Sequence, residues 1–138
     1  MKVVLDANII IAALLGSNAT LRLLVSPEHE LYAPHKIIDE IKKYKQYICE
    51  KSGQTEEDFT INFEALLAFI DVLDYSDYEK QIEASKEAIA ERDWKDTDYL
   101  ACALAIQADF IWSNDKDFSA QQLVLMKTTQ QFMNDFLA

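Results

Sequence analysis

Glycine and proline are scarce in this chain of 138 residues, which has two of each. A sandwich of many short β-strands needs turn residues at short intervals, so this scarcity favours long helices joined by short connections. Half of the residues are hydrophobic, which excludes a disordered chain. At this length, we expect a single domain that spans residues 1–138.

Cysteine is equally rare. Cys49 and Cys102 are the only two and do not form a Cys-x-x-Cys pair. We therefore expect reduced, structural thiols in a cytoplasmic protein, not a zinc or redox site. The first apolar segment, Ile9 to Leu15, is too short to span a bilayer, and no signal peptide is visible. The sequence thus predicts a cytoplasmic protein with no membrane partner.

Positive charge is also in short supply, with 13 Lys and Arg against 24 Asp and Glu and a net charge of -11. A surface this acidic repels phosphate backbones, which disfavours a generic nucleic-acid binder. An acidic site that recruits divalent cations remains compatible with it. The chain also lacks the P-loop, H-E-x-x-H and G-x-G-x-x-G motifs, and its two histidines have no ligand-like spacing.

Two short apolar runs each lead into an aspartate. The run Val3–Leu5 is followed by Asp6, and Phe110–Trp112 is followed, after two polar residues, by Asp115. Such runs are typical of buried parallel strands. Ligands of open α/β sheets bind at the carboxyl ends of the strands, so we expect both aspartates to face one site.

Strands and helices alternate along the whole chain. We expect strands at 1–5, 30–33, 70–73, 110–112 and 123–126, and helices at 8–15, 20–25, 35–50, 55–69, 76–90, 96–108 and from 128 or 129 to 136. Thr55 and Ser76 each begin a capping-box sequence that starts a helix. This alternation predicts an α/β fold with a mostly parallel sheet.

Glu40 lies inside one of these helices. It follows Ile37 by three residues and precedes Tyr44 by four, so it borders the apolar stripe of its helix. A partly buried carboxylate needs a partner, and a metal ion is one candidate. A glutamate at the edge of the stripe that reaches solvent is the other reading, and the residues alone favour it.

Asp96 opens the helix that leads into the Phe110–Trp112 strand. Each aspartate also has a simple local explanation: Asp6 and Asp96 as N-caps, Asp115 as a turn residue, and Asp98 as a solvent-facing side chain. Gathered together, carboxylates repel one another unless they are protonated or bridged by cations. Oxygen-only ligation selects hard ions such as Mg²⁺ or Mn²⁺, and two such ions about 3.5–4 Å apart can promote phosphodiester hydrolysis.

Three blocks of the sequence resemble the PIN-domain nucleases. The family's opening block is matched by VVLDANIIIAALL, its second block by PHKIIDEI, and its long third block by DWKDTDYLACALAIQADFIWSNDKDF. The resemblance runs from Val3 to the C-terminal helix. It implies a PIN-like three-layer α/β/α sandwich with a mostly parallel central sheet.

The resemblance also implies a set of site residues. The acids Asp6, Glu40, Asp96 and Asp115 match the four metal-binding positions and would hold one or two Mg²⁺ or Mn²⁺ ions. Asn8 and Ser113 would orient these ligands through hydrogen bonds. Asp98 lies two residues after Asp96, so it either assists or replaces that acid.

The activity that the resemblance implies is that of an endoribonuclease, which hydrolyses RNA with metal-activated water and leaves a 3′-hydroxyl and a 5′-phosphate. Small PIN proteins, VapC-like toxins among them, are often dimeric toxins of bacterial toxin–antitoxin pairs, held inactive by the antitoxin. A catalytically silent PIN-like module that binds metal or a partner protein is the alternative. Lys36, Lys42, Lys43 and Lys45 share the segment of Glu40 and could guide RNA, although a solvated helix face explains them equally well.

Overall fold

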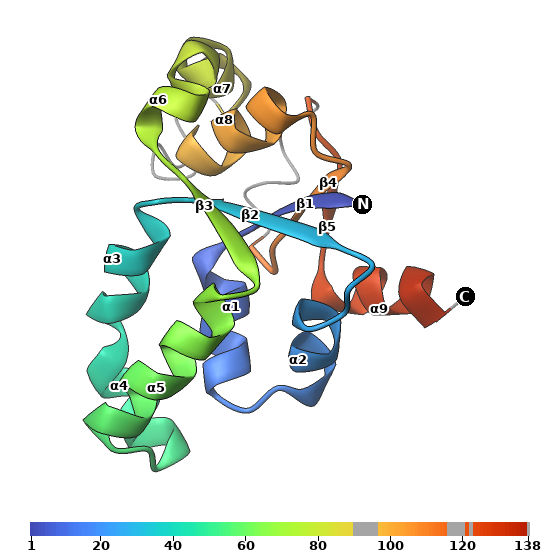
Figure 1. The fold of residues 1–138 in the computed structure, drawn as a ribbon. Helices are drawn as coiled ribbons and strands as arrows, with labels where there is room; N and C mark the ends of the chain where they lie inside the picture. The colour runs from blue at the N-terminus through green and yellow to red at the C-terminus, as the bar shows by residue number, and fades with distance from the viewer. Residues whose placement is uncertain (90–96, 116–120, 122, 138) are drawn as a thin grey trace.

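In the computed structural model, which describes residues 1–89, 97–115, 121 and 123–137, a five-stranded sheet lies between two layers of helices (Figure 1). The strands are β1 (Lys2–Leu5), β2 (Glu30–Pro34), β3 (Ile70–Leu73), β4 (Phe110–Trp112) and β5 (Met126–Lys127), in the order β3-β2-β1-β4-β5. Each pairing between these strands is parallel. The predicted α/β fold, with a parallel sheet between two layers of helices, is confirmed.

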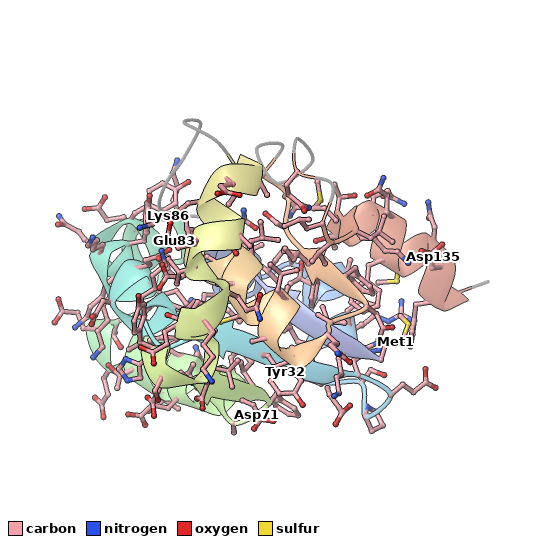
Figure 2. The ribbon with its side chains drawn as sticks, turned by 90° about the horizontal axis from the view of Figure 1, so that it is seen from above. Met1, Tyr32, Asp71, Glu83, Lys86 and Asp135 are labelled. Carbon is pink, nitrogen blue, oxygen red and sulfur yellow. The ribbon has the colours of Figure 1, made fainter. Side chains whose placement is uncertain are left out.

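The core lies on both faces of the two central strands. Residues Val3–Leu5 of β1 and Ile111–Trp112 of β4 are completely buried. Parallel strands joined by helical crossovers are covered on both faces, which explains why β1 and β4 are continuous apolar runs without alternation. Toward the edge of the sheet the burial decreases: Tyr32 of β2 and exposed Asp71 of β3 are register partners and lie side by side (Figure 2).

Helices from the first half of the chain, together with the last helix, cover one face of the sheet (Figure 1). They are α1 (Ala7–Leu14), α2 (Asn18–Leu24), α3 (Ile37–Lys43), α4 (Lys45–Ser52), α5 (Glu56–Leu67) and α9 (Thr129–Leu137). No single helix in the described ranges is long and apolar enough to cross a membrane, although α1 and α2, bent by 120°, would pass that test together.

The opposite face carries α6 (Tyr75–Tyr78), the 3₁₀ turn η1 (Glu79–Gln81), α7 (Ile82–Ile89) and α8 (Thr97–Ile106) (Figure 1). The α8 helix lies against β1, β2 and β4. Its buried residues Ala101, Cys102 and Ala103 have small side chains, which allow this close approach of helix to sheet. Cys49 is half-buried and Cys102 is buried, and the two do not form a disulfide.

The helix predicted for 35–50 is wrong as a single element, because the structure divides it into α3 and α4 at Tyr44. The backbone leaves helical geometry there (φ -96°, ψ 6°), and Tyr44 is 50% exposed, away from the core side of the stripe. Helix α3 starts only at Ile37. The N–H of His35, just after β2, still donates to the carbonyl of Leu73 at the end of the neighbouring strand β3, so the chain continues the sheet pairing up to this point. Gly53, with φ 74°, ends α4 where a break was expected.

The capping box predicted at Thr55 is confirmed, whereas the one predicted at Ser76 is wrong. The observed box pairs Asp74 with Asp77, two residues earlier, and the backbone N–H of Asp74 donates to Asp77 at 2.9 Å. The sequences that begin at Asp74 and at Ser76 both place a capping side chain three residues before an acidic one. The observed choice places Tyr78 in the core, where it is 3% exposed.

The last strand was predicted at 123–126 but comprises only Met126–Lys127. The side-chain oxygen of Gln121 accepts hydrogen bonds from the N–H groups of Leu123 and Val124, both at 2.9 Å, so these residues form a turn before the strand. Of the two threonines at which the last helix was expected to begin, Thr128 caps α9 by accepting a bond from the N–H of Gln131 at 3.2 Å.

Candidate active site

The candidate site lies where the strand order reverses. From β1 the chain builds outward through β2 to β3, then returns to the other side of β1 to add β4 and β5. The last residues of the two central strands, Leu5 and Trp112, are register partners. Asp6 and Ser113 therefore leave adjacent strands at the carboxyl edge, which is the usual position of ligand sites in such sheets.

Asp6 is the buried acid of this site, with 7% of its surface exposed. One carboxylate oxygen accepts the N–H of Ala7 at 2.7 Å, so Asp6 does cap α1. The other accepts the hydroxyl of Ser113 at 2.9 Å and the side-chain amide of Asn8 at 3.0 Å. Capping therefore accounts for only one of the three hydrogen bonds that the Asp6 carboxylate accepts.

The pKa of Asp6 is raised from 3.8 to about 6. Burial is the main cause, because it penalises the charged form. The hydrogen bonds from Ser113 and Ala7 oppose this effect, whereas the negative charges of Glu40 and Asp115 add to it. Glu40 and Asp115, both far from Asp6 in the sequence, are thus close enough to repel its charge, and a cation among these acids would relieve that repulsion.

Asn8, Ser113 and Asn114 hold the turn that follows β4. The Asn8 side chain donates to Ser113 Oγ at 3.3 Å and accepts the N–H of Asn114 at 3.3 Å. The Ser113 hydroxyl, itself fully buried, also accepts the N–H of Asp115 at 3.0 Å. The orienting roles expected for Asn8 and Ser113 are compatible with these bonds, because both side chains connect the Asp6 carboxylate to the backbone that carries Asp115.

Glu40 lies in the first turn of α3, and its side chain is 28% exposed. The buried Tyr99 of α8 donates its hydroxyl to Glu40 Oε2 at 3.1 Å. Lys36 Nζ lies 3.6 Å from Glu40 Oε1. Glu40 is therefore held by groups from two helices and is not simply a surface glutamate, whereas its neighbour Asp39 is exposed.

Asp98 had two readings, a solvent-facing side chain and an acid that assists or replaces Asp96, and the contacts in the structure do not agree with the first. Its Oδ2 accepts the hydroxyl of Tyr78 at 2.6 Å, and its Oδ1 lies 3.8 Å from Lys36 Nζ. It is thus drawn into the same network as Glu40. Asp96, the other predicted acid of this helix start, lies outside the described residues.

The four lysines considered for RNA binding differ in their surroundings. Lys36 is half-buried and lies between Glu40 and Asp98. Lys45 pairs with Glu56 at 3.7 Å, and of the set only Lys42 and Lys43 are exposed. The i,i+4 spacing of Lys36 and Glu40 is a sequence signal for this pair. No comparable signal in the sequence indicates the parts played by Tyr78 and Tyr99.

A carboxylate-only donor set such as Asp6, Glu40 and Asp115 suits a hard divalent ion by its chemistry. Within the ranges that the structure describes, no three Asp, Glu, His or Cys side chains are grouped closely enough to hold a metal ion. The acids act on one another through their charges. We infer that these side chains fit such an ion in kind and in charge, and that they would have to draw closer to share one.

The cavity around His29 is separate from this site. It has a volume of about 330 Å³, and its lining includes Met1 and Asp135, which lie toward the same end of the molecule (Figure 2). This is the amino-terminal end of the strands, opposite the acids. His29 packs edge-on against Phe132 there, with ring centroids 4.7 Å apart.

Comparison with known proteins places these observations in a family. The solved structure of VapBC2 from Rickettsia felis, bound to a DNA fragment from its promoter, aligns over 93% of this chain and 98% of that chain, with a TM-score of 0.66 and 16% identity. No curated protein matches the sequence. The family model of the PIN domain matches residues 4–135. The chain therefore belongs to the PIN domain family.

Proposed function

We propose that this protein is a cytoplasmic, metal-dependent endoribonuclease and the toxin of a bacterial toxin–antitoxin pair. PIN domains are typically nucleases and generally bind divalent metals. The observation that carries the proposal is the buried Asp6 at the reversal of strand order, with its pKa raised to about 6 by burial and by the charges of Glu40 and Asp115. A carboxylate whose charged form is penalised by burial and by neighbouring negative charges lowers the stability of the protein, and such acids are typical of functional sites.

The residues that would hold the ion are Asp6, Glu40 and Asp115, with Asp96, which lies outside the described residues, as the fourth acid that the family resemblance implies. Mg²⁺ or Mn²⁺, as one or two ions, would supply an activated water as the nucleophile and would neutralise charge on the phosphate. Ser113 and Asn8 keep the Asp6 carboxylate oriented through hydrogen bonds of 2.9 and 3.0 Å. Tyr99 does the same for Glu40 at 3.1 Å. The protein thus contributes charge and orientation.

RNA must approach a strongly acidic protein in this proposal. The exposed Lys42 and Lys43 lie in the last turn of the helix that carries Glu40, and they are the positive charges that this helix offers to RNA. Such contacts to phosphates bind without sequence preference and weaken with salt. RNA binding at this helix should therefore be weak and salt-sensitive.

The toxin assignment is supported by the similarity in fold to VapBC2, whose structure was solved bound to promoter DNA. An antitoxin protein is the expected partner, and a homodimer the expected assembly. Co-expression of the chain with the protein encoded beside its gene tests this directly, because the pair should purify together and expression of the chain alone should arrest growth.

The test of the activity is cleavage of single-stranded RNA by the purified protein with Mn²⁺, with EDTA, and with the Asp6→Asn variant. Cleavage that requires both the metal and Asp6 supports the proposal. A wild-type protein that binds Mn²⁺ but leaves RNA intact supports instead a catalytically silent metal-binding or partner-binding module. The observation that favours this second candidate is the wide spacing of the acids within the described residues.

A further inference from the structure

The turn after β4 is fastened to the start of α9 through the side chain of Asn114. The side-chain oxygen of Asn114 accepts the backbone N–H of Thr129 at 3.0 Å, and its side-chain amide donates to Thr129 Oγ1 at 3.3 Å. With the amide turned the other way, two donors would face each other at the Thr129 N–H, so this contact fixes the orientation of the Asn114 side chain. We call this two-bond contact the Asn114–Thr129 pair.

Thr129 is a firm anchor for this contact. Its Oγ1 also accepts the indole N–H of the buried Trp112 at 3.0 Å. Three residues further along α9, Phe132 is 1% exposed and packs edge-on against Trp112, with ring centroids 5.0 Å apart. Buried aromatic rings therefore seat α9 on β4, and the first turn of α9 gives the turn after β4 a fixed point of attachment.

The backbone of Asn114 belongs to the acidic site. Its N–H donates to Asn8 Oδ1 at 3.3 Å, and the N–H of the next residue, Asp115, donates to Ser113 Oγ at 3.0 Å. The negative charge of Asp115 is close enough to act on Asp6. Asn114 is thus the residue at which the acidic site and α9 meet, one position before a proposed metal ligand.

The exposure of Asn114 separates positioning from stability. Its side chain lies at the surface, where water can replace a lost hydrogen bond, so the two bonds to Thr129 contribute little to the stability of the fold. They do restrict the backbone between Ser113 and Asp115, because a side chain bound through both of its polar atoms cannot turn without breaking a bond. Metal ligands depend on such outer contacts for their orientation.

We propose that Asn114 is a positioning residue of the active site, which holds the Asp115 carboxylate through the Asn114–Thr129 pair where it can share a divalent ion with Asp6. This rests on the proposed function, since it assumes that Asp115 is a metal ligand. Asn114 acts through the backbone of the residue that follows it, and Thr129 acts through Asn114. The site thereby extends beyond the strand ends to the first turn of α9.

The test is titration calorimetry with Mn²⁺ on wild type and on variants that break the pair from either side. Asn114→Ala removes both bonds and should bind Mn²⁺ about tenfold more weakly, as is typical when a contact behind a metal ligand is lost. Thr129→Val should have a smaller effect of about threefold, because the backbone N–H of Thr129 remains. Thr129→Ser, which restores the hydroxyl, should recover most of that loss. The double variant Asn114→Ala/Thr129→Val should bind no more weakly than Asn114→Ala, because both changes remove one shared contact.

Asn134→Ala is the matched control. Asn134 is another exposed asparagine, on α9 itself, and its side-chain oxygen accepts a hydrogen bond from Gln130 at 2.9 Å. Its removal should leave the Mn²⁺ affinity within about twofold of wild type. The metal-free melting temperatures of Asn114→Ala and Asn134→Ala should agree, whereas Thr129→Val should melt lower, because it leaves the Trp112 indole N–H without its acceptor.

RNA cleavage supplies a readout that a merely structural role would not move. At a fixed, subsaturating Mn²⁺ concentration, Asn114→Ala should lower kcat about tenfold and leave KM for RNA within about twofold, because the RNA surface is unchanged. Raising the Mn²⁺ concentration should restore part of kcat. If Asn114→Ala folds poorly, Asn114→Gln, whose longer side chain misplaces both polar atoms, carries the same expectations.

The outcomes separate this proposal from the proposed function. If wild type binds Mn²⁺ and cleaves RNA, and Asn114→Ala does both equally well, the role of Asn114 is overturned and the metal site stands. Equal losses in Asn114→Ala and Asn134→Ala also overturn it, as does a double variant whose loss is the product of the two single losses. A wild type that binds no Mn²⁺ overturns the metal site and the positioning role together.

Discussion

Replacing Asp6 with asparagine should make the metal-free protein more stable at neutral pH. A pKa of about 6 in place of 3.8 corresponds to about 3 kcal/mol of destabilisation when the carboxylate is ionised. The amide removes that charge but places an NH₂ group against the donors of Ser113 and Asn8, which costs about 1 kcal/mol for the lost hydrogen bonding. The free energy of unfolding should therefore rise by about 2 kcal/mol.

The gain should depend on pH in a defined direction. The folded-state pKa lies above the unfolded value, so the folded protein binds more protons between pH 3.8 and about 6. Wild-type stability is therefore lost as the pH rises through this window, and the asparagine variant escapes the loss. The difference between the two proteins should be full at pH 7 and absent or reversed below pH 4.

Urea denaturation in EDTA, followed by circular dichroism at pH 4 and pH 7, measures this difference. Asp39→Asn, an exposed change on α3, is the matched control for net charge. Mn²⁺ at about 100 times its dissociation constant should stabilise only the wild type, by about 2.7 kcal/mol, which reverses the order of the two proteins. An Asp6→Asn protein that is no more stable than wild type at pH 7 would refute the reasoning, as would a gain equal at both pH values.

Three further changes test the other contacts. Glu40→Gln should weaken Mn²⁺ binding and RNA cleavage at least tenfold, whereas Asp39→Asn should weaken neither. Equal effects in the two variants would show that the loss comes from bulk charge and not from ligation. Asp115→Asn should lower the pKa of Asp6, because one of the charges that raises it is gone, and should raise the metal-free melting temperature slightly; an unchanged Asp6 titration by carboxyl NMR would contradict this. Tyr99→Phe removes the hydroxyl that holds Glu40, so it should lower the free energy of unfolding in urea by about 1 kcal/mol and weaken Mn²⁺ binding. An Mn²⁺ affinity equal to that of wild type by calorimetry would exclude a positioning role for that hydroxyl.

Local patterns in the sequence identified most of the elements correctly. The apolar runs Val3–Leu5 and Phe110–Trp112 have no polar alternation, and both are buried strands. The capping box at Thr55 and the stop at Gly53 depend on hydrogen bonds and backbone angles within a few residues, so they can be read from the chain itself.

The errors occurred where a local pattern had two solutions. Capping-box sequences begin at both Asp74 and Ser76, and the structure uses the first, with Tyr78 buried in the core. The segment 35–50 has helical periodicity throughout, so a continuous helix with Tyr44 on its core side was predicted. In the structure the helix breaks at Tyr44, and this side chain is exposed. Packing against the sheet selects between such alternatives, and packing partners are distant in the sequence.

The same division applies to the site. The sequence showed which acids are present and which blocks resemble the family. It also placed Asp6 and Asp115 after strands, because the carboxyl end of a strand is a local property. The proximity of these acids depends on the pairing of β1 with β4, which brings Asp6 beside Ser113 across more than a hundred residues. The place of Lys36 between Glu40 and Asp98 likewise depends on how α3 packs beside α8. The sequence by itself determined which acids are present and at which strand ends, whereas only the tertiary structure decided which charges meet, because burial and Coulomb interactions depend on distances in space.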